Sequence, residues 1–180
     1  MREFKKEEIE SLVDQAKDLD REPLSELCVY FYPRIYRYVY YRVRTREDAE
    51  DITSEVFVRM VKSLGTQKGS FRAWLFRIAS NLVVDYYRRS ARQKQMFLRE
   101  KDTELLERRE DHNEEFALQD RLRRGLNQLT DEQQQVITLK FVEGYNNSEI
   151  ADMLGKSAGA VKALQFRALT RLRGILENED

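Results

Sequence analysis

The sequence predicts an all-helical protein built from two small helical domains. Its 180 residues include only seven glycines and two prolines, and apolar residues recur at helical rather than alternating spacing. With 41% apolar residues, the chain can bury a substantial core. Charge and composition divide it into a first domain at 1–94, a charged linker at 95–114 and a second domain at 115–180.

Two helices are expected at the start of the first domain. The first helix lies near residues 4–20. Pro23 opens the second, which runs to about Arg44 and carries many tyrosines. Pro33 lies inside this second helix, where a proline removes a backbone hydrogen bond, so we expect a kink or a split there.

Two longer helices complete the first domain. Thr45 is a suitable N-cap for the third helix, and Gly65 can supply a left-handed C-cap at its end. The inward face of this third helix is expected to consist of Ala49, Ile52, Val56 and Met60. After a glycine-containing break, a fourth helix runs from Phe71 into the nineties.

The second domain contains the most informative motif. Residues 99–112 are charged and are predicted to be a weakly ordered linker or an exposed helix end. The domain then starts near Glu115, and its third helix begins with a capping box at 130–133. A short helix from Asn147, a turn at Gly155 and a basic helix ending near Arg173 form a helix-turn-helix, which places one helix against the DNA major groove.

Charge is strongly segregated, although the formal net charge is zero. Residues 77–94 carry five bases against one acid, and residues 156–174 carry five bases and no acid. Residues 1–27 and 100–120 are both acidic. Two basic blocks separated by an acidic one indicate two nucleic-acid surfaces joined by a connector, although each block alone is also compatible with a solvated face.

The fourth helix has two stripes at helical spacing. Phe71, Leu75, Ile78, Leu82 and Tyr86 form the expected core face. The adjoining stripe combines an aromatic ring, cations and hydrogen-bonding groups, as single-stranded DNA requires for stacking, phosphate contact and base reading. It consists of Trp74, Arg77, Asn81, Asp85, Arg88 and Arg89. Trp74 considered alone is more readily interpreted as a core residue.

The last helix also has a polar and an apolar side. Its inward face is expected to be Val161, Leu164, Ala168, Leu172 and Ile175. Candidate contacts to duplex DNA are Ser157, Lys162, Ala163, Phe166 and Arg167. Ser157 can N-cap the helix beside a phosphate, and Phe166 can contact thymine methyl groups. Alternatively, Phe166 closes a small core or packs against another protein.

Several segments resemble the extracytoplasmic-function sigma factors, the short form of the bacterial sigma-70 family. The similarity rests on Asp48-Ala-Glu-Asp-Ile-Thr-Ser-Glu-Val-Phe-Val58, on Phe71-Arg-Ala-Trp-Leu-Phe-Arg-Ile-Ala-Ser-Asn81, on Asp85-Tyr-Tyr-Arg-Arg89 and on the C-terminal stretch from Glu149 to Lys162. These segments occur in order and cover nearly the whole chain.

The resemblance implies a promoter-specificity subunit of bacterial RNA polymerase. It implies that the first domain docks the coiled coil of the polymerase β′ clamp through Asp48, Asp51, Glu55, Phe57 and Arg59. The 71–94 region would open and capture the minus-ten element as a single strand. The 130–173 region would bind the β flap tip and read the minus-thirty-five element as duplex. The resemblance also implies control by a separate anti-sigma factor, and it implies neither a catalytic site, nor a cofactor, nor a metal.

Other classes of protein fit less well. A one-domain repressor would leave the Trp74 stripe and the acidic helix without a role, whereas a helical antagonist of sigma factors remains an alternative. An enzyme is not favoured, because the single histidine, His112, lies in a charged segment and no catalytic motif or CxxC or ExxH pair is present, although the carboxylates of Asp48, Asp51 and Glu55 could weakly hold a divalent ion. One cysteine, Cys28, and the lack of a long apolar stretch predict a cytoplasmic protein without membrane insertion.

Overall fold

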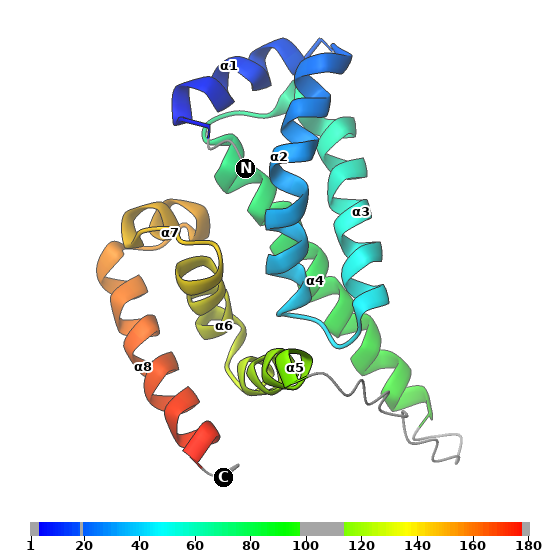
Figure 1. The fold of residues 1–180 in the computed structure, drawn as a ribbon. Coiled ribbons are helices and arrows are strands. Elements are labelled where there is room, and N and C mark those ends of the chain that lie inside the picture. Colours follow the sequence, from blue (N-terminus) through cyan, green and yellow to red (C-terminus); the bar gives the residue numbers. More distant parts are fainter. Residues whose placement is uncertain (1–3, 19, 98–113, 178–180) are drawn as a thin grey trace.

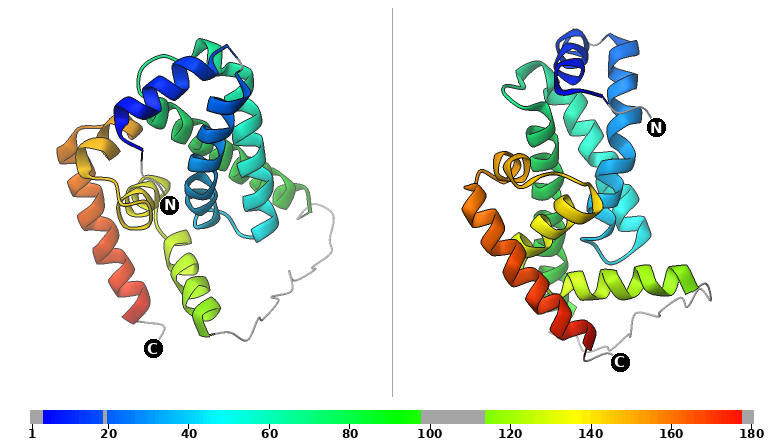
Figure 2. Two further views of the ribbon diagram at one scale, coloured as in Figure 1. Left: turned by 45° about the horizontal axis from the view of Figure 1, so that its top comes forward. Right: turned by 60° about the vertical axis from the view of Figure 1, so that its left-hand side comes forward.

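The computed structural model confirms the all-helical prediction. It describes residues 4–18, 20–97 and 114–177, and these residues form helices and turns without a strand. Most of the linker expected at 95–114, including His112, lies outside the described residues, whereas residues 95–97 and Glu114 lie in helices. The helices form two domains that lie side by side (Figures 1 and 2).

The N-terminal domain consists of four α-helices and one short turn of 3₁₀ helix. In chain order they are α1 (Lys6–Ala16), α2 (Arg21–Tyr40), α3 (Arg46–Ser63), η1 (Leu64–Thr66) and α4 (Phe71–Phe97). Helix α2 packs against α1 and α3, and α3 packs against α4. Helix α4 continues past residue 94, where the sequence placed the end of the domain. This long helix carries one of the two candidate DNA surfaces.

The start of α3 follows the sequence prediction, but its end does not. Thr45 is the N-cap, and its hydroxyl oxygen accepts a hydrogen bond from the Asp48 amide at 3.0 Å. Of the predicted inward face, Ala49, Val56 and Met60 are buried. Gly65 is not a left-handed C-cap, because the helix passes directly into η1 and the positive φ of 74° occurs at Gly69 instead.

Pro33 does not split α2. The helix is continuous from Arg21 to Tyr40 with Pro33 inside it, and Asp20 rather than the Pro23 region supplies the N-cap. A proline interior to a helix lacks an amide donor and disturbs the preceding turn. The Arg34 guanidinium Nη1 donates to the Tyr30 carbonyl oxygen at 2.8 Å, in the turn that precedes Pro33.

The C-terminal domain is a compact set of four α-helices. They are α5 (Glu114–Asn127), α6 (Asp131–Ile137), which continues into the π-helical turn η2 (Thr138–Val142), α7 (Asn147–Leu154) and α8 (Ala158–Glu177). The capping box of Thr130 and Gln133 is present, although it begins the second helix of the domain rather than the third. Gly155 caps α7 in the left-handed region, at φ 63° and ψ 38°, so the predicted helix-turn-helix is formed by α7 and α8.

The hydrophobic core continues from one domain into the other. A single cluster of buried side chains joins Phe31, Leu75 and Phe76 in the N-terminal domain to Leu139 and Ile150 in the C-terminal domain. Helix α7 packs against α4, and η2 packs against α2. The fold therefore places the C-terminal domain directly on the helix that carries the first candidate DNA surface.

Candidate nucleic-acid and polymerase interfaces

The polar stripe of α4 is largely accessible to solvent. Arg77, Asn81, Arg88 and Arg89 are exposed, and Asp85 is half-buried. The Asp85 carboxylate lies 3.7 Å from Arg88 Nη1, so one cation of the stripe has an acidic neighbour. The exposed guanidinium groups can contact phosphates, and the Asn81 amide can both donate and accept hydrogen bonds at a base edge.

Trp74 has both a structural and an accessible side. Its ring lies 5.6 Å from the Phe71 ring, centroid to centroid, and packs against the core cluster. The residue is nevertheless half-buried rather than fully buried. Trp74 thus anchors α4 while keeping part of its ring available for stacking.

The outer face of α8 is exposed and basic. Lys162, Ala163 and Arg167 are exposed, and Phe166 retains 73% of its accessible surface. The predicted inward residues Val161, Leu164, Ala168 and Leu172 are buried, and Ile175 is half-buried. Phe166 therefore does not close a core within the described residues. An exposed aromatic ring among cations is suited to an external ligand.

The N-terminus of α8 is capped as the sequence predicts. The Ser157 hydroxyl oxygen accepts a hydrogen bond from the Ala160 amide at 3.1 Å. Nearby, Lys156 Nζ lies 2.6 Å from Glu132 Oε1, which ties the turn of the helix-turn-helix to α6. These contacts fix the angle at which α8 leaves the domain.

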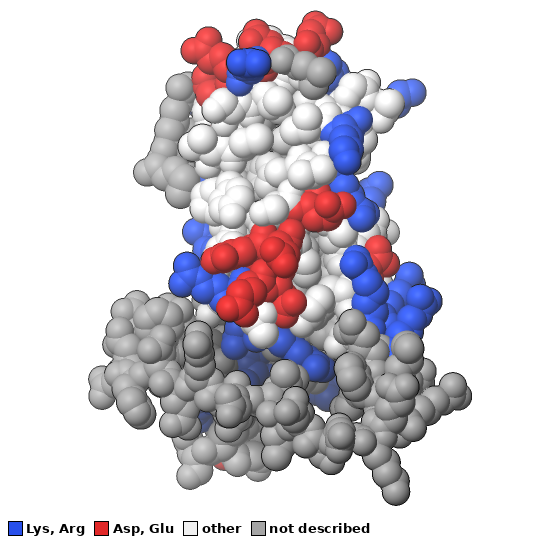
Figure 3. All heavy atoms as spheres, turned by 90° about the vertical axis from the view of Figure 1, so that its right-hand side faces the viewer, with Lys and Arg blue, Asp and Glu red and all other residues white. Residues whose placement is uncertain are grey.

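Acidic side chains gather on one side of the N-terminal domain. Figure 3 shows this band on the face where α3 lies in Figure 1. Asp51 and Glu55 of the predicted polymerase-binding set are exposed, as are Glu47 and Glu50, and their spacing of three and four residues places them along one side of α3. This side of α3 therefore presents several carboxylates to a partner, and Arg46 Nε lies 2.9 Å from one of them, Glu50 Oε1.

Other members of that set also have partners within the domain. Asp48 Oδ2 accepts hydrogen bonds from the Thr45 hydroxyl at 2.6 Å and the Tyr86 hydroxyl at 2.9 Å. Arg59 Nε lies 2.7 Å from Glu55 Oε1, and this hydrogen bond lowers the pKa of the Glu55 carboxyl.

Phe57 is the remaining member of the predicted polymerase-binding set. Its ring stacks on that of Tyr32 of α2, with ring centroids 5.6 Å apart. Asp48 and Phe57 therefore have structural roles that sequence reasoning did not predict.

A buried arginine joins the two domains. Arg42, just after α2, has no accessible surface, and its guanidinium donates to the Tyr38 hydroxyl and to the Asp131 carboxylate at the start of α6. Beside it, Gln134 Nε2 donates to the Tyr41 carbonyl oxygen at 3.1 Å. Sequence reasoning missed this contact, because nothing in the local pattern distinguishes the buried Arg42 from the exposed Arg44 two residues later.

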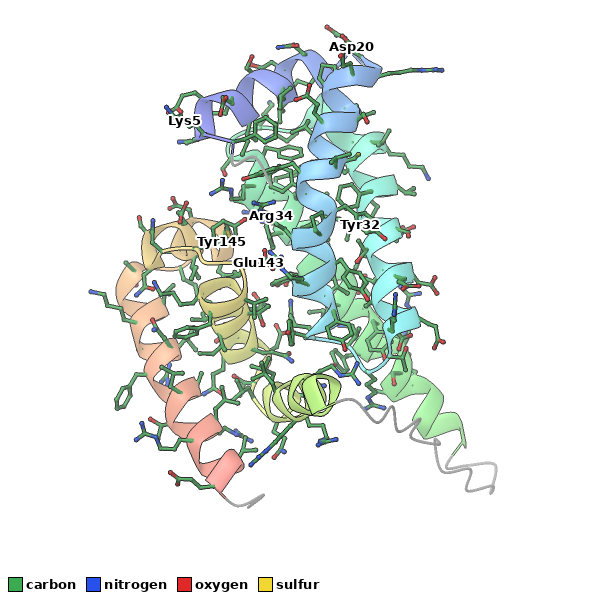
Figure 4. All side chains as sticks on the ribbon, in the orientation of Figure 1. Lys5, Asp20, Tyr32, Arg34, Glu143 and Tyr145 are labelled. Atoms are coloured by element: carbon green, nitrogen blue, oxygen red, sulfur yellow. The ribbon has the colours of Figure 1, made fainter. Side chains whose placement is uncertain are left out.

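Two further arginines cross the same interface. Arg37 on α2 holds Glu143 bidentately, with Nε–Oε1 and Nη2–Oε2 distances of 3.0 and 3.1 Å. Arg72 Nη1 lies 3.0 Å from Glu149 Oε1, and the Arg72 guanidinium lies over the Tyr145 ring. In Figure 4, Glu143 and Tyr145 point from the C-terminal domain toward α2.

Burial raises the pKa of the Glu143 carboxyl, an effect that the Arg37 hydrogen bond opposes. This acid is thus well enclosed by the contact between the domains.

Family models match both domains. Residues 27–93 match sigma-70 region 2, and residues 125–174 match sigma-70 region 4. The chain is 31% identical to the ECF RNA polymerase sigma factor SigX of Bacillus subtilis, over 82% of this chain and 80% of SigX. It is also 31% identical to ShbA of Streptomyces griseus, over 98% of this chain and all of ShbA. The chain belongs to the ECF sigma factors. Sigma factors are promoter-recognising initiation factors and not enzymes.

Further similarities agree with this assignment. The ECF sigma factor BldN of Streptomyces coelicolor is 35% identical over 93% of this chain, which spans 66% of BldN. The fold is similar to that of CnrH in complex with the cytosolic domain of CnrY, with a TM-score of 0.74, 23% identity, and coverage of 94% of this chain and 97% of CnrH.

It is also similar to RpoE in complex with the anti-sigma factor NepR from Bartonella quintana, with a TM-score of 0.68, 21% identity, and coverage of 85% and 96%. In the described part of this ECF sigma factor, no helix is long and apolar enough to cross a membrane.

Proposed function

We propose that this ECF sigma factor binds core RNA polymerase in the cytoplasm and directs initiation at promoters with a minus-ten and a minus-thirty-five element. The observation that carries the proposal is the presence of two exposed cationic surfaces with different chemistry. The α4 surface combines cations with an amide and a partly accessible indole. The α8 surface combines cations with an exposed phenylalanine on a recognition helix.

Each surface suits one form of DNA. On α4, the Trp74 ring offers a stacking platform, Asn81 reads a base edge, and Arg77, Arg88 and Arg89 contact phosphates of a separated strand. Asp85 would orient Arg88. On α8, base edges and phosphates of the intact major groove meet the exposed side chains. The residues proposed for that contact are Ser157, Lys162, Ala163, Phe166 and Arg167.

Polymerase docking is proposed for the acidic side of α3. Asp51 and Glu55 are exposed and lie four residues apart on one side of α3, on the face where acidic side chains gather in Figure 3, which favours a basic partner surface such as a clamp coiled coil. Arg59 would hold Glu55 in place, while Asp48 and Phe57 would fix the helix on which the band lies. The C-terminal domain would bind the β flap. An anti-sigma factor is a further proposed partner.

The test replaces Asn81 with alanine and measures promoter opening on polymerase. Asn81 is exposed, so Asn81→Ala should leave stability nearly unchanged, whereas Trp74→Ala would also loosen the packing on Phe71. We expect far fewer unpaired thymines in permanganate footprints and nearly unchanged binding to the upstream duplex. Gln128→Ala, which changes an exposed amide outside both surfaces, is the matched control. Equal losses in promoter opening and duplex binding would contradict the assignment of Asn81 to the separated strand.

A further inference from the structure

An open groove of about 380 Å³ lies along α1 and reaches α2, at the end of the N-terminal domain that carries α1 (Figure 1). The apolar part of its lining consists of Phe4 and Leu12, which are half-buried and pack against the hydrophobic core. The Phe4 ring meets the Tyr30 ring of α2 edge-on, with 4.8 Å between the ring centroids. Because the core holds these side chains in place, the groove is formed before a ligand arrives.

Carboxylates surround the apolar floor of this groove. Glu7, Glu8 and Glu26 line it, and Glu7 and Glu26 are exposed. Residues 1–27 carry nine acids against five bases, and acidic side chains gather at this end of the molecule in Figure 3. The negative charge repels DNA phosphates and anionic lipid head groups, and it attracts cationic side chains. The ligand that fits the groove is therefore a protein segment with apolar side chains between cations.

A segment of this kind is present on α8. Phe166 and Leu169 are 73% and 43% exposed. Exposed cations flank them at four residues on either side, and together they form the α8 stripe, which consists of Lys162, Phe166, Leu169 and Arg173. Spacings of four, three and four residues place the stripe on one side of the helix, over a length of roughly 16 Å. Because residues 156–174 contain no acid, the α8 stripe has the apolar centre and the cationic flanks that the groove requires.

The α8 stripe does not fill the groove of its own chain. Helix α8 packs against α5, α6 and α7, whereas α1 packs against α2 and α4. Phe166 and Leu169 are both exposed, and the groove is open. In this arrangement, a contact between the stripe and the groove joins two copies of the chain. Leu169 also lies outside the residues proposed to contact duplex DNA, so the stripe and the proposed DNA surface overlap without being identical.

We propose that the groove along α1 is a docking site for α8 of a second copy of this chain. Phe166 and Leu169 lie on the apolar floor, and the flanking cations lie beside the carboxylates. A helix that lays an apolar stripe into a groove is a recurring mode of protein recognition. The groove and the stripe are different surfaces, so the contact is heterologous, the kind that builds rings or open chains. A contact confined to one groove is small, so the association is weak and grows with protein concentration.

Sedimentation of the purified full chain at rising concentration and low salt tests the proposal. The wild type should form dimers and larger species, and their fraction should fall as added salt screens the charges. Glu26→Lys places a cation in the groove lining, and Leu169→Ala removes part of the apolar stripe, so each should weaken association about tenfold or more. Glu10→Lys is the matched control, because Glu10 is an exposed α1 residue outside the groove lining. It makes the same charge change and should associate as the wild type does.

A mixture of the two variants identifies the two surfaces. Glu26→Lys keeps its α8 stripe, and Leu169→Ala keeps its groove, so the mixture retains one complete pairing of stripe with groove. We expect a one-to-one complex in the mixture at concentrations where each variant alone is monomeric. Because the complex needs an intact surface from each variant, its formation also shows that both variants are folded.

Four results would overturn the proposal. A wild type that stays monomeric at every concentration would leave the groove to a different protein. Association that Glu26→Lys does not weaken would place the contact outside the groove, and equal weakening by Glu10→Lys would reduce the effect to net charge. A mixture that forms no complex, although both variants keep the wild-type circular dichroism spectrum, would show that stripe and groove do not meet. The proposed function fails by a separate result: a chain that associates as expected but directs polymerase to no promoter.

Discussion

Replacement of Gly155 tests the geometry of the helix-turn-helix. Gly155 caps α7 at φ 63°, and a Cβ added there meets no atom within 4 Å. Gly155→Ala therefore changes backbone conformational energy alone. A non-glycine residue in the left-handed region costs about 1–2 kcal/mol. Alanine also makes the unfolded chain less flexible than glycine does, and this offsets about 0.4–1 kcal/mol of the cost. The net expectation is a loss of about 1 kcal/mol in the free energy of unfolding.

The same domain supplies a matched control. Gly174 lies within α8, its φ is not positive, and an added Cβ meets nothing within 4 Å. Gly174→Ala should therefore stabilise the helix by about 0.5–1 kcal/mol. Gly155→Asn should cost less than Gly155→Ala, because asparagine tolerates the left-handed region.

Urea unfolding followed by circular dichroism measures all three variants. A difference of about 1.5–2 kcal/mol between the two alanine variants is expected. Equal stability would refute the left-handed turn and with it the predicted orientation of α8.

Three further predictions concern single side chains. If Lys162 contacts a phosphate, Lys162→Gln should reduce by about one unit the slope of the log binding constant against log salt concentration for the upstream element. The slope is measured for holoenzyme on the duplex that carries this element, and an unchanged slope would argue against the contact. Phe166→Ala should change the free energy of unfolding by less than about 0.5 kcal/mol, since the ring is 73% exposed, yet weaken duplex binding; intact binding would leave the ring without a role on DNA. Burial, followed by the Asp48 hydrogen bond, raises the pKa of Tyr86 to about 12. Because this pKa is above the unfolded value of about 10, the stability that the contact contributes is present below pH 10 and lost as the pH rises through 12. In a pH titration of tyrosinate absorbance, Tyr86→Phe should show one fewer tyrosine that deprotonates at high pH than the wild type does. Identical titration curves for the two proteins would contradict the assignment.

Local sequence signals predicted the secondary structure where side chains and backbone act within one turn. Thr45 and Thr130 are N-caps because their hydroxyl oxygens accept hydrogen bonds from amides three residues ahead, and that chemistry is visible in the sequence. Gly65 shows the limit of such reasoning. Glycine permits a left-handed conformation without requiring it, and here the chain uses Gly69 instead.

Contacts between distant segments could not be read from the sequence. Helical spacing predicted which residues of α4 and α8 point outward, because burial follows the period of the helix. It gave no information on what lies opposite an outward residue. The pairing of Arg37 with Glu143 and of Asp48 with Tyr86 depends on how whole helices pack, so only the structure revealed them.

Transcription by reconstituted polymerase provides a direct test of promoter recognition by α4 and α8. Core RNA polymerase, the purified chain and a pool of genomic fragments are combined, and the starts of the transcripts are sequenced. New start sites that share two upstream sequence elements are expected, and only when the chain is added. If polymerase with the chain starts transcription at no sites beyond those used without it, the assignment of promoter recognition to α4 and α8 is contradicted.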